Sequence, residues 1–216
     1  MSNLKRHAIP KSWPIQRKGT AFVVQPNVGF ADSLPILIIL RDLLKVAQNR
    51  KEAKKMIHMK SILVNEKEVR DEKQGVLLFD TITLVPSKKN YRLTVLKNEK
   101  LNIEEVKESE AATKVAKIID KKMLKGKKIQ LNLSDGRNFL SNIKCKVNDS
   151  VLINFKSKKI EKCLPFEENS QVMVFAGKHS GEKGKVEKIN QERKTAEINT
   201  GEEKINVLIK QFIVTN

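Results

Sequence analysis

Short runs of alternating apolar and polar residues, separated by turn residues at close intervals, fill the second half of this chain. The pattern is clearest at Ile129–Leu133, which precedes the turn Ser134-Asp135-Gly136. Alternation with period two is typical of half-buried strands, and strands this short and closely spaced favour small barrels over a parallel sheet. Four further runs share this character: Val151–Phe155, Val172–Phe175, Thr195–Asn199 and Lys204–Val207.

The first half of the chain follows other patterns. Residues 1–33 have no sustained period and contain three prolines, which predicts an irregular basic arm. Apolar residues then recur at helical spacing from Pro35 to Ala47, and a second helix is expected after Asn49, which can cap it, with Glu52 three residues on. Residues 62–85 have strand character, so a helix-helix-sheet module is predicted.

Residues 98–110 change the composition, because five glutamates outnumber two lysines there. A glutamate-rich stretch of this kind predicts a solvated connection or an exposed helix. We therefore place a domain boundary in this region.

The charge of the chain is strongly positive. Its 216 residues include 43 Lys and Arg against 25 Asp and Glu, and twelve of these cations but three of the acids lie in the first sixty residues. This excess predicts a partner dense in negative charge, of which nucleic acid is the commonest. A membrane is not indicated, because the longest apolar run, Leu34–Leu40, is too short to span a bilayer and no signal-peptide core follows the N-terminus. The cytosol is the expected compartment.

Patterns typical of catalysis are missing from the sequence. The histidines His7, His58 and His179 fall in no metal-ligand or nucleophile-base arrangement, and no glycine-rich phosphate-binding motif occurs. We expect His58 to be partly packed in its helix, whereas His7 and His179 lie among lysines and suit phosphate contact. Cys145 and Cys163 form no Cys-x-x-Cys pair and are expected to be reduced and buried. No enzyme activity, cofactor or metal is predicted.

The two expected helices lead into Ile62-Leu-Val-Asn-Glu-Lys-Glu-Val69, and this arrangement resembles the S4-type RNA-binding domain, also called the alpha-L motif. Glu66 stands where that motif usually has Gly, so either the turn type differs or Asn65 takes the left-handed conformation. The resemblance implies that the helices present cations to an RNA backbone, and the alternative is a merely solvated helix face. The cations concerned are Arg41, Lys45, Arg50, Lys51, Lys54, Lys55 and Lys60.

A second motif, Val172-Met-Val-Phe-Ala-Gly-Lys-His-Ser-Gly-Glu-Lys-Gly-Lys-Val186, looks like a KOW motif. Its glycines would let the backbone turn tightly and approach another chain, while its cations project from the loop. An ordinary glycine hairpin is the alternative. The glycines are Gly177, Gly181 and Gly184, and the projecting side chains are Lys178, His179, Lys183 and Lys185.

Most of the chain resembles the archaeal and eukaryotic small-subunit ribosomal protein S4e family. The segments that carry this resemblance are Leu4-Lys-Arg-His7, Ile9-Pro-Lys-Ser-Trp13, Leu34-Pro-Ile-Leu37, Gln130–Asn138 and the KOW loop. Three features depart from the family pattern: Gly29-Phe30-Ala31 replaces Gly-Pro-His, Ser134 stands where archaeal members often have His, and the chain stops soon after Val214, where longer relatives have an extension.

The resemblance implies a structural protein of the small ribosomal subunit, in an archaeal or otherwise compact form, that binds ribosomal RNA and neighbouring ribosomal proteins but no membrane or small-molecule substrate. The expected fold class is α+β in four modules: a basic arm (1–33), an S4-like RNA-binding domain (34–96), a central β-rich domain (97–167) and an SH3-like KOW barrel (168–216). Recognition of folded RNA by shape is expected, because aromatic residues are 5% of the chain.

Further RNA contacts are expected outside the two motifs. Trp13 could stack on an exposed base or anchor the arm to the folded body. The remaining candidates are Lys5, Arg6, His7, Lys11, Trp13, Arg17, Lys18 and Arg137.

Two other functional classes share parts of this pattern. Domains like the helical module also occur in pseudouridine synthases and tyrosyl-tRNA synthetases, but no segment here is large enough for their catalytic domain. KOW barrels also occur in transcription elongation factors, which would not need the S4-like module or the basic arm.

Overall fold

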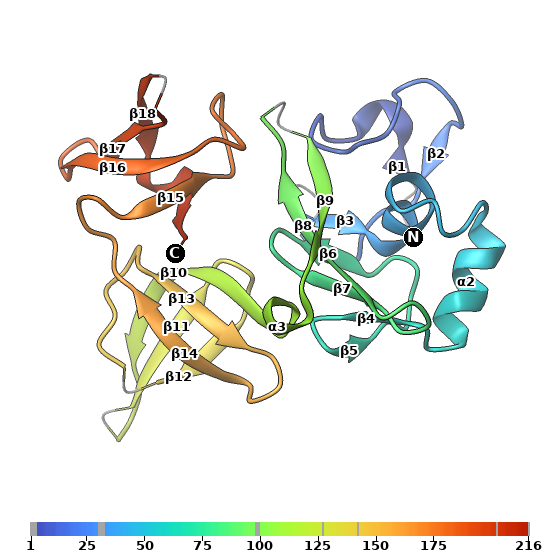
Figure 1. Ribbon diagram of the computed structural model, residues 1–216, viewed down its shortest axis with the longest axis horizontal. Coiled ribbons are helices and arrows are strands. Elements are labelled where there is room, and N and C mark those ends of the chain that lie inside the picture. The colour runs from blue at the N-terminus through green and yellow to red at the C-terminus, as the bar shows by residue number, and fades with distance from the viewer. Residues whose placement is uncertain are drawn as a thin grey trace. The chain divides into compact units, whose positions relative to one another are not determined.

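The computed structural model describes residues 4–29, 33–97, 100–126, 128–141, 143–201 and 203–215. The chain forms two compact units (Figure 1): unit 1 comprises Met1–Val95 with Lys100–Ala112, and unit 2 comprises Leu96–Glu99 with Thr113–Asn216. The fold is β-rich with few helices, so the predicted mixture of helix and sheet is confirmed.

Unit 1 begins with a small folded segment. Strand β1 (Leu4–Lys5) pairs antiparallel with β2 (Phe22–Val23), and η1 (Arg6–Ala8) is a short 3-10 helix between them. Trp13 is 2% exposed and packs in the apolar core of the unit. The backbone is irregular from residue 9 to residue 21, as predicted, but a buried indole fixes it to the body.

The first predicted helix is shorter than expected. After β3 (Ser33–Pro35), α1 (Ile36–Ile38) continues directly into the π-helical segment η2 (Ile39–Leu43), where the Leu44 amide donates to the Ile39 carbonyl at 2.9 Å. Ile36, Leu40 and the residues between them are at most 1% exposed. The helical segment ends at Leu43, four residues before the predicted limit, and Lys45 has a left-handed φ of +52°, which prevents its continuation.

Helix α2 (Arg50–His58) confirms the second prediction. The Glu52 amide donates to Asn49 Oδ1 at 3.0 Å, and Glu52 Oε2 accepts from the Gln48 amide at 2.7 Å. This reciprocal capping satisfies free N–H groups at the start of the helix. Ala53 and Ile57 form its buried side.

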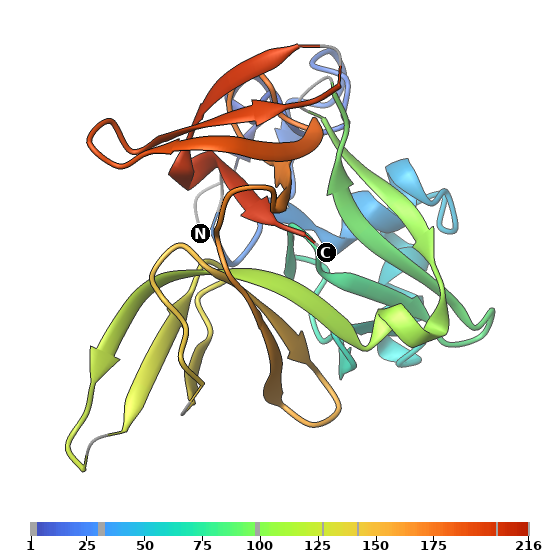
Figure 2. The same cartoon turned by 60° about the vertical axis from the view of Figure 1, so that its left-hand side comes forward.

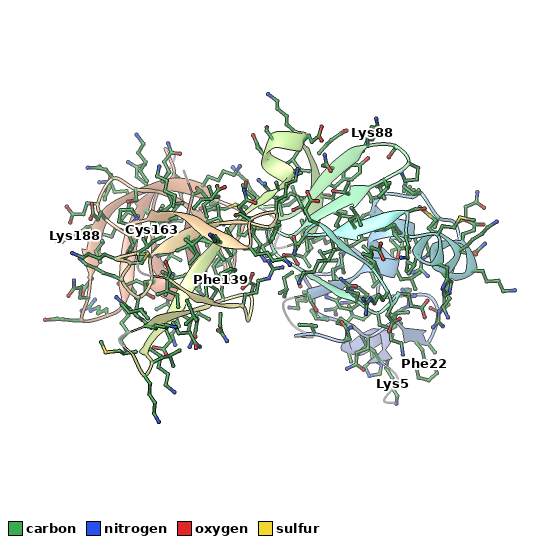
Figure 3. The ribbon with its side chains drawn as sticks, turned by 90° about the horizontal axis from the view of Figure 1, so that it is seen from below. Lys5, Phe22, Lys88, Phe139, Cys163 and Lys188 are labelled. Atoms are coloured by element: carbon green, nitrogen blue, oxygen red, sulfur yellow. The ribbon has the colours of Figure 1, made fainter. Side chains whose placement is uncertain are left out.

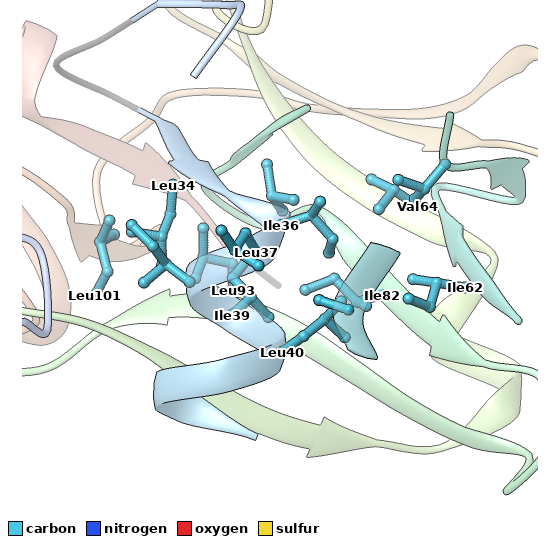
Figure 4. Packing of buried hydrophobic residues seen from close by; sticks show 14 of the residues in the cluster. Leu34, Ile36, Leu37, Ile39, Leu40, Ile62, Val64, Ile82, Leu93 and Leu101 are labelled. Atoms are coloured by element: carbon cyan, nitrogen blue, oxygen red, sulfur yellow. The ribbon is translucent and has the colours of Figure 1, made fainter. Parts of the chain in front are cut away.

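The main sheet of unit 1 is antiparallel, in the order β5-β4-β7-β8-β9. Its strands are β4 (Ile62–Val64), β5 (Lys67–Glu68), β7 (Thr81–Leu84), β8 (Lys89–Val95) and β9 (Leu101–Val106), while β6 (Gly75–Leu77) pairs with β3. Figure 4 shows Ile62, Ile82 and Leu93 of this sheet packing with the apolar residues of α1 and η2.

The interpretation of residues 98–110 as a solvated connection or exposed helix is wrong for most of their length. Strand β9 completes the sheet, with Leu101 opposite Val95 and Ile103 opposite Leu93, and the short helix α3 (Glu108–Ala111) follows. Glu104 and Glu105 occupy exposed positions of this strand, so the local charge obscured the strand pattern of Leu101 and Ile103. Residues 98 and 99 lie outside the described residues.

Unit 2 contains two five-stranded antiparallel sheets. The first has the order β12-β11-β10-β13-β14 and consists of β10 (Thr113–Met123), β11 (Ile129–Leu133), β12 (Asn138–Leu140), β13 (Ser150–Asn154) and β14 (Lys159–Leu164). Strand β10 pairs with β13 through its first half and with β11 through its second half. The core of this sheet includes Ile118, Leu131 and Val151.

The cysteines belong to this part of the unit. Both thiols are free; Cys145 is buried, as predicted, whereas Cys163 is half-buried. Burial raises the pKa of the Cys163 thiol to about 12, which keeps it protonated at neutral pH.

The second sheet of unit 2 has the order β18-β17-β16-β15-β19. Its strands are β15 (Gln171–Val174), β16 (Lys183–Asn190), β17 (Thr195–Asn199), β18 (Lys204–Leu208) and β19 (Phe212–Val214), with the 3-10 helix η3 (Ile209–Gln211) before the last. Four of the predicted strand runs agree with β13, β15, β17 and β18. Lys183, Gly184 and Lys185 lie in β16 and not in a loop, which corrects their predicted place.

A buried lysine joins the two sheets of unit 2. Lys117 of β10 donates from Nζ to the carbonyls of Ile209 and Phe212, the latter at 2.9 Å, and its Nζ lies 4.8 Å from the centroid of the Phe212 ring. Beside it, the Val214 amide donates to Ser150 Oγ at 3.0 Å. These polar contacts lie in the buried interior, where an unmade hydrogen bond would be costly.

The turn between β4 and β5 resolves the alternatives that Glu66 raised. Leu63 pairs with Glu68 and Val64 with Lys67, so the loop is two residues long, and both Asn65 (φ +50°) and Glu66 (φ +63°) are left-handed. Positive φ at both positions defines a type I′ hairpin turn. Asn65 tolerates this conformation, whereas Glu66 is strained.

We expect Glu66→Gly to stabilise the protein by about 0.5–1 kcal/mol, because glycine adopts positive φ without steric cost. The greater freedom of glycine in the unfolded chain offsets part of this gain. Urea unfolding at neutral pH measures this. Lys67→Gly, in the neighbouring strand, is the control and should destabilise. An unfolding midpoint for Glu66→Gly at or below the wild-type value would contradict the turn assignment.

Burial lowers the pKa of Lys117 to about 8, from an ordinary value of 10.5. Between these two pH values the unfolded chain binds more protons than the native one. The contribution of Lys117 to the free energy of unfolding therefore rises with pH across this range and is constant above it. We expect the free energy of unfolding of the wild type, minus that of Lys117→Met, to rise between pH 7.5 and pH 10. A difference independent of pH would show that Lys117 titrates as an exposed lysine.

Candidate nucleic-acid interface

Helix α2 presents two exposed cations on its outer side. Lys51 and Lys55 are one helical turn apart and both are exposed. Among the described residues neither forms an ion pair. His58 lies one further turn along and is also exposed, so the expectation that it is partly packed is wrong. These side chains are available to phosphate oxygens.

The other cations of α2 face the body of unit 1. Arg50 Nε donates to Glu72 Oε2 at 2.9 Å, a second bond joins Arg50 Nη2 to Glu72 Oε1, and Lys54 Nζ lies 3.6 Å from Oε1. The Glu72 side chain is 4% exposed. Hydrogen bonding to Arg50 lowers the pKa of Glu72, and the same bond raises the pKa of Arg50. Arg50 therefore neutralises a buried carboxylate, a role that the sequence analysis did not foresee.

Three further candidate RNA-binding cations in unit 1 differ in whether they form an ion pair. Arg41 pairs with Asp42 at 2.8 Å and Lys60 with Glu68 at 3.0 Å, in partly or well exposed ion pairs that RNA phosphates could displace at small cost. Lys45 is exposed.

Most of the N-terminal candidate residues are exposed, whereas one cation is hydrogen-bonded within the arm. Lys5, His7, Lys11, Arg17 and Lys18 are exposed, and Figure 3 labels Lys5. The Arg6 guanidinium instead donates to the carbonyls of Thr20 at 2.6 Å and Gln16 at 2.7 Å. These bonds join the start of the arm to residues 16–20. The buried position of Trp13 favours anchoring over base stacking.

Arg137 is a packed residue of the first sheet of unit 2. Its Nε lies 3.5 Å from Asp135 Oδ2, and its guanidinium carbon lies 4.8 Å from the centroid of the Phe155 ring. Lys114 Nζ approaches the same carboxylate at 3.4 Å. The Asp135 side chain is 4% exposed, so this group compensates a buried charge.

In the KOW segment the glycines have different backbone requirements. Gly177 (φ +88°) and Gly181 (φ +89°) are left-handed, whereas Gly184 lies in β16, where an added Cβ would approach the Asn199 carbonyl oxygen to 2.4 Å. Gly184 therefore serves strand packing.

In the KOW segment the histidine lies beside an acid, whereas the lysines are exposed. Lys178, Lys183 and Lys185 are exposed, and His179 Nδ1 lies 3.5 Å from Glu182 Oε1. Residues 165–216 contain eight Lys and Arg and eight Asp and Glu.

The sequence has a second lysine-rich stretch at residues 114–128, but no RNA contact was predicted in that stretch. Residues 113–164 contain fourteen Lys and Arg against four Asp and Glu, so this segment and the first sixty residues together account for the net positive charge of the chain. The positive surface of unit 2 therefore belongs to its first sheet.

Neither a metal site nor a membrane-spanning helix appears in the part of the chain that the structure describes. No three His, Cys, Asp or Glu side chains gather there as possible ligands, and no helix there combines the length and apolar character needed to cross a bilayer.

The Arg50–Glu72 pair gives a stability prediction. Glu72→Gln should lower the free energy of unfolding by about 1–2 kcal/mol at pH 7, because it removes charge-assisted hydrogen bonds from a buried group whose partner is half exposed. Since the pKa of Glu72 is lowered below 4.5, the loss should shrink as pH falls below that value. Glu68→Gln, in an exposed pair, is the control, and an equal loss in both variants would contradict a structural role for Glu72.

Comparison with known proteins assigns the chain to a family. The model of ribosomal family S4e matches residues 87–160. The small ribosomal subunit protein eS4 of Methanocella arvoryzae is 39% identical over 198 residues, covering 90% of this chain and 84% of the relative. The corresponding protein of Methanothermobacter thermautotrophicus is 36% identical over 218 residues, covering 98% of this chain and 90% of the relative.

A solved structure agrees on the fold. The crystal structure of the 30S ribosomal protein S4e from Thermoplasma acidophilum superposes with a TM-score of 0.75 and covers 86% of this chain and 95% of its own, at 24% sequence identity. The two relatives named above are 39% and 36% identical to this chain, and their alignments cover 90% and 98% of it. The chain therefore belongs to the S4e family of ribosomal proteins.

Proposed function

We propose that this protein is a structural constituent of the small ribosomal subunit, where it binds and stabilises ribosomal RNA in the cytoplasmic ribosome and supports translation. The observation that carries the proposal is the similarity to small-subunit proteins eS4 along 98% of the chain. Its partners are ribosomal RNA and neighbouring ribosomal proteins, and its action is binding without turnover, with no cofactor or small-molecule substrate.

The proposed mechanism is neutralisation of crowded phosphates by cations held on folded modules. Lys51 and Lys55 suit this role because they are exposed on the capped helix α2 and form no ion pair with an acid among the described residues. The exposed N-terminal cations add to the same charge. Arg6, Arg50 and Arg137 contribute indirectly, because their side chains hold the modules together.

The proposed organisation has four modules: a basic arm (1–33), an S4-like RNA-binding domain (34–96), a central β-rich domain (97–167) and an SH3-like KOW barrel (168–216). Strand β9 and helix α3 belong to unit 1, so the S4-like domain extends through them and the central domain begins at β10. The five-stranded antiparallel sheet over β15–β19 supports the last of these, because SH3-like barrels are five-stranded. In the KOW segment, Lys178, His179, Lys183 and Lys185 are the proposed RNA contacts.

A transcription elongation factor is the competing function. The eS4 relatives cover the basic arm and the helical module as well as the KOW segment, which favours the ribosome. Tagged protein should sediment with small ribosomal subunits at low salt. Recovery with RNA polymerase and not with subunits would overturn the proposal.

We expect Lys51→Gln/Lys55→Gln to weaken binding to small-subunit ribosomal RNA and to reduce the slope of log affinity against log salt by about 1.5, since each phosphate contact contributes about 0.7–0.9. Filter binding between 50 and 300 mM salt measures this. Lys88→Gln/Lys89→Gln removes the same charge from the exposed β7–β8 turn and should leave the slope unchanged (Lys88, Figure 3). Equal slopes for both double variants would contradict a specific role for α2.

A further inference from the structure

The β10–β11 hairpin carries a dense group of exposed lysines that the two motifs do not explain. Beyond Lys117 strand β10 leaves β13 and pairs with β11 alone as far as Met123 opposite Ile129, and the Leu124 amide closes the loop by donating to the Lys128 carbonyl at 2.8 Å. In Figure 2 this hairpin is the yellow-green pair of strands that extends away from the rest of its unit. Its exposed cations are Lys121, Lys122, Lys125 and Lys128.

A neighbouring loop enlarges this group. Lys121 Nζ donates to the Cys145 carbonyl at 3.1 Å, which places the loop that carries the exposed Lys144 and Lys146 beside the hairpin. These six lysines are here called the hairpin surface. None of them forms an ion pair among the described residues.

Acids do not balance this surface. Asp120 is the one acid between residues 115 and 134, and its Oδ1 accepts from the Lys121 amide at 2.8 Å. Asp149 is buried and accepts from the amides of Lys146 at 2.7 Å and Phe166 at 2.9 Å. Like charges gathered without acids repel one another, so they lower the stability of the free protein unless an anionic partner covers them.

Exposed apolar side chains lie within the same sheet. Lys122 is opposite Gln130, and Gln130 is opposite Leu140, so Lys122 and Leu140 share a face, where Leu140 is 62% exposed. At the end of β10, Met123 is 73% exposed. Large apolar side chains among unpaired lysines indicate a surface that a partner covers, and phosphates together with riboses supply both the charge and the apolar contact.

We propose that the hairpin surface is a second RNA-binding surface, distinct from α2, that contacts the phosphate backbone of ribosomal RNA. This rests on the proposed function. The antiparallel ladder holds the lysines on a rigid support. Because the charge of residues 165–216 is balanced, the KOW contacts proposed above add less to RNA binding than α2 and the hairpin surface do. The chain then holds RNA mainly at two basic surfaces.

The test compares two triple variants of the full chain that lose the same charge. Lys122→Gln/Lys125→Gln/Lys128→Gln removes the outer lysines of the hairpin. Lys188→Gln/Lys194→Gln/Lys210→Gln is the matched control, taken from exposed positions around the second sheet of unit 2 (Lys188, Figure 3). Neither variant should melt below the wild type, because none of these side chains is buried.

Binding of each protein to in vitro transcribed small-subunit ribosomal RNA is measured across salt concentrations. We expect the hairpin variant to lose about 2–3 from the slope of log affinity against log salt, and the control to lose less than about 0.5. A wild-type slope in the hairpin variant, or equal losses in both variants, would overturn the proposal.

The outcomes also separate this inference from the proposed function. If the wild type binds steeply and loses slope with Lys51→Gln/Lys55→Gln but not with the hairpin variant, the second surface is refuted while RNA binding stands. If the wild type does not bind the RNA, both fail.

Discussion

Alternation along short antiparallel strands governs where this chain can hold its positive charge. Successive side chains of a strand point to opposite faces, so each strand that buries an apolar row offers its other row to solvent. In β18, Ile205 and Val207 are buried, whereas Lys204, Asn206 and Leu208 are exposed. The two apolar cores of unit 2 arise mainly in this way, whereas the core of unit 1 also buries helical residues.

Side-chain partners divide the cations into two kinds. Arg50, Arg137 and Lys117 bind buried carboxylates or carbonyls and stabilise the modules. Lys51, Lys55 and the hairpin lysines are exposed and are not paired with acids among the described residues. A protein that binds ribosomal RNA needs both kinds, because a cation can neutralise a phosphate at low entropic cost only when its support is already rigid.

Local signals made part of the structure predictable. Asn49 and Glu52 form the expected cap of α2. Asn65 takes the left-handed conformation offered as one alternative, but Glu66 takes it as well, which neither alternative included. Strands with regular alternation, such as β11 and β17, lie where the pattern placed them. In each case the deciding contacts join residues within a few positions of one another.

Contacts between distant residues made the rest unpredictable. The partner of Arg50 is 22 positions away, and the Lys117 ammonium binds carbonyls 92 and 95 positions away. Trp13 is buried by residues of the helices and sheet, which no period in the arm reveals. Ile36–Leu40 are all buried, where amphipathic spacing predicted a helix with one exposed face, and that spacing gives no sign of the π-helical hydrogen bonds of η2.

Amide hydrogen exchange of the full chain, with and without small-subunit ribosomal RNA, tests most directly whether RNA meets the protein at two separate basic surfaces. The account predicts slower exchange on RNA binding in α2 and around the β10–β11 loop, with smaller changes over residues 186–208 of the charge-balanced segment. Bound RNA that leaves exchange unchanged in α2 or in the β10–β11 loop would contradict it.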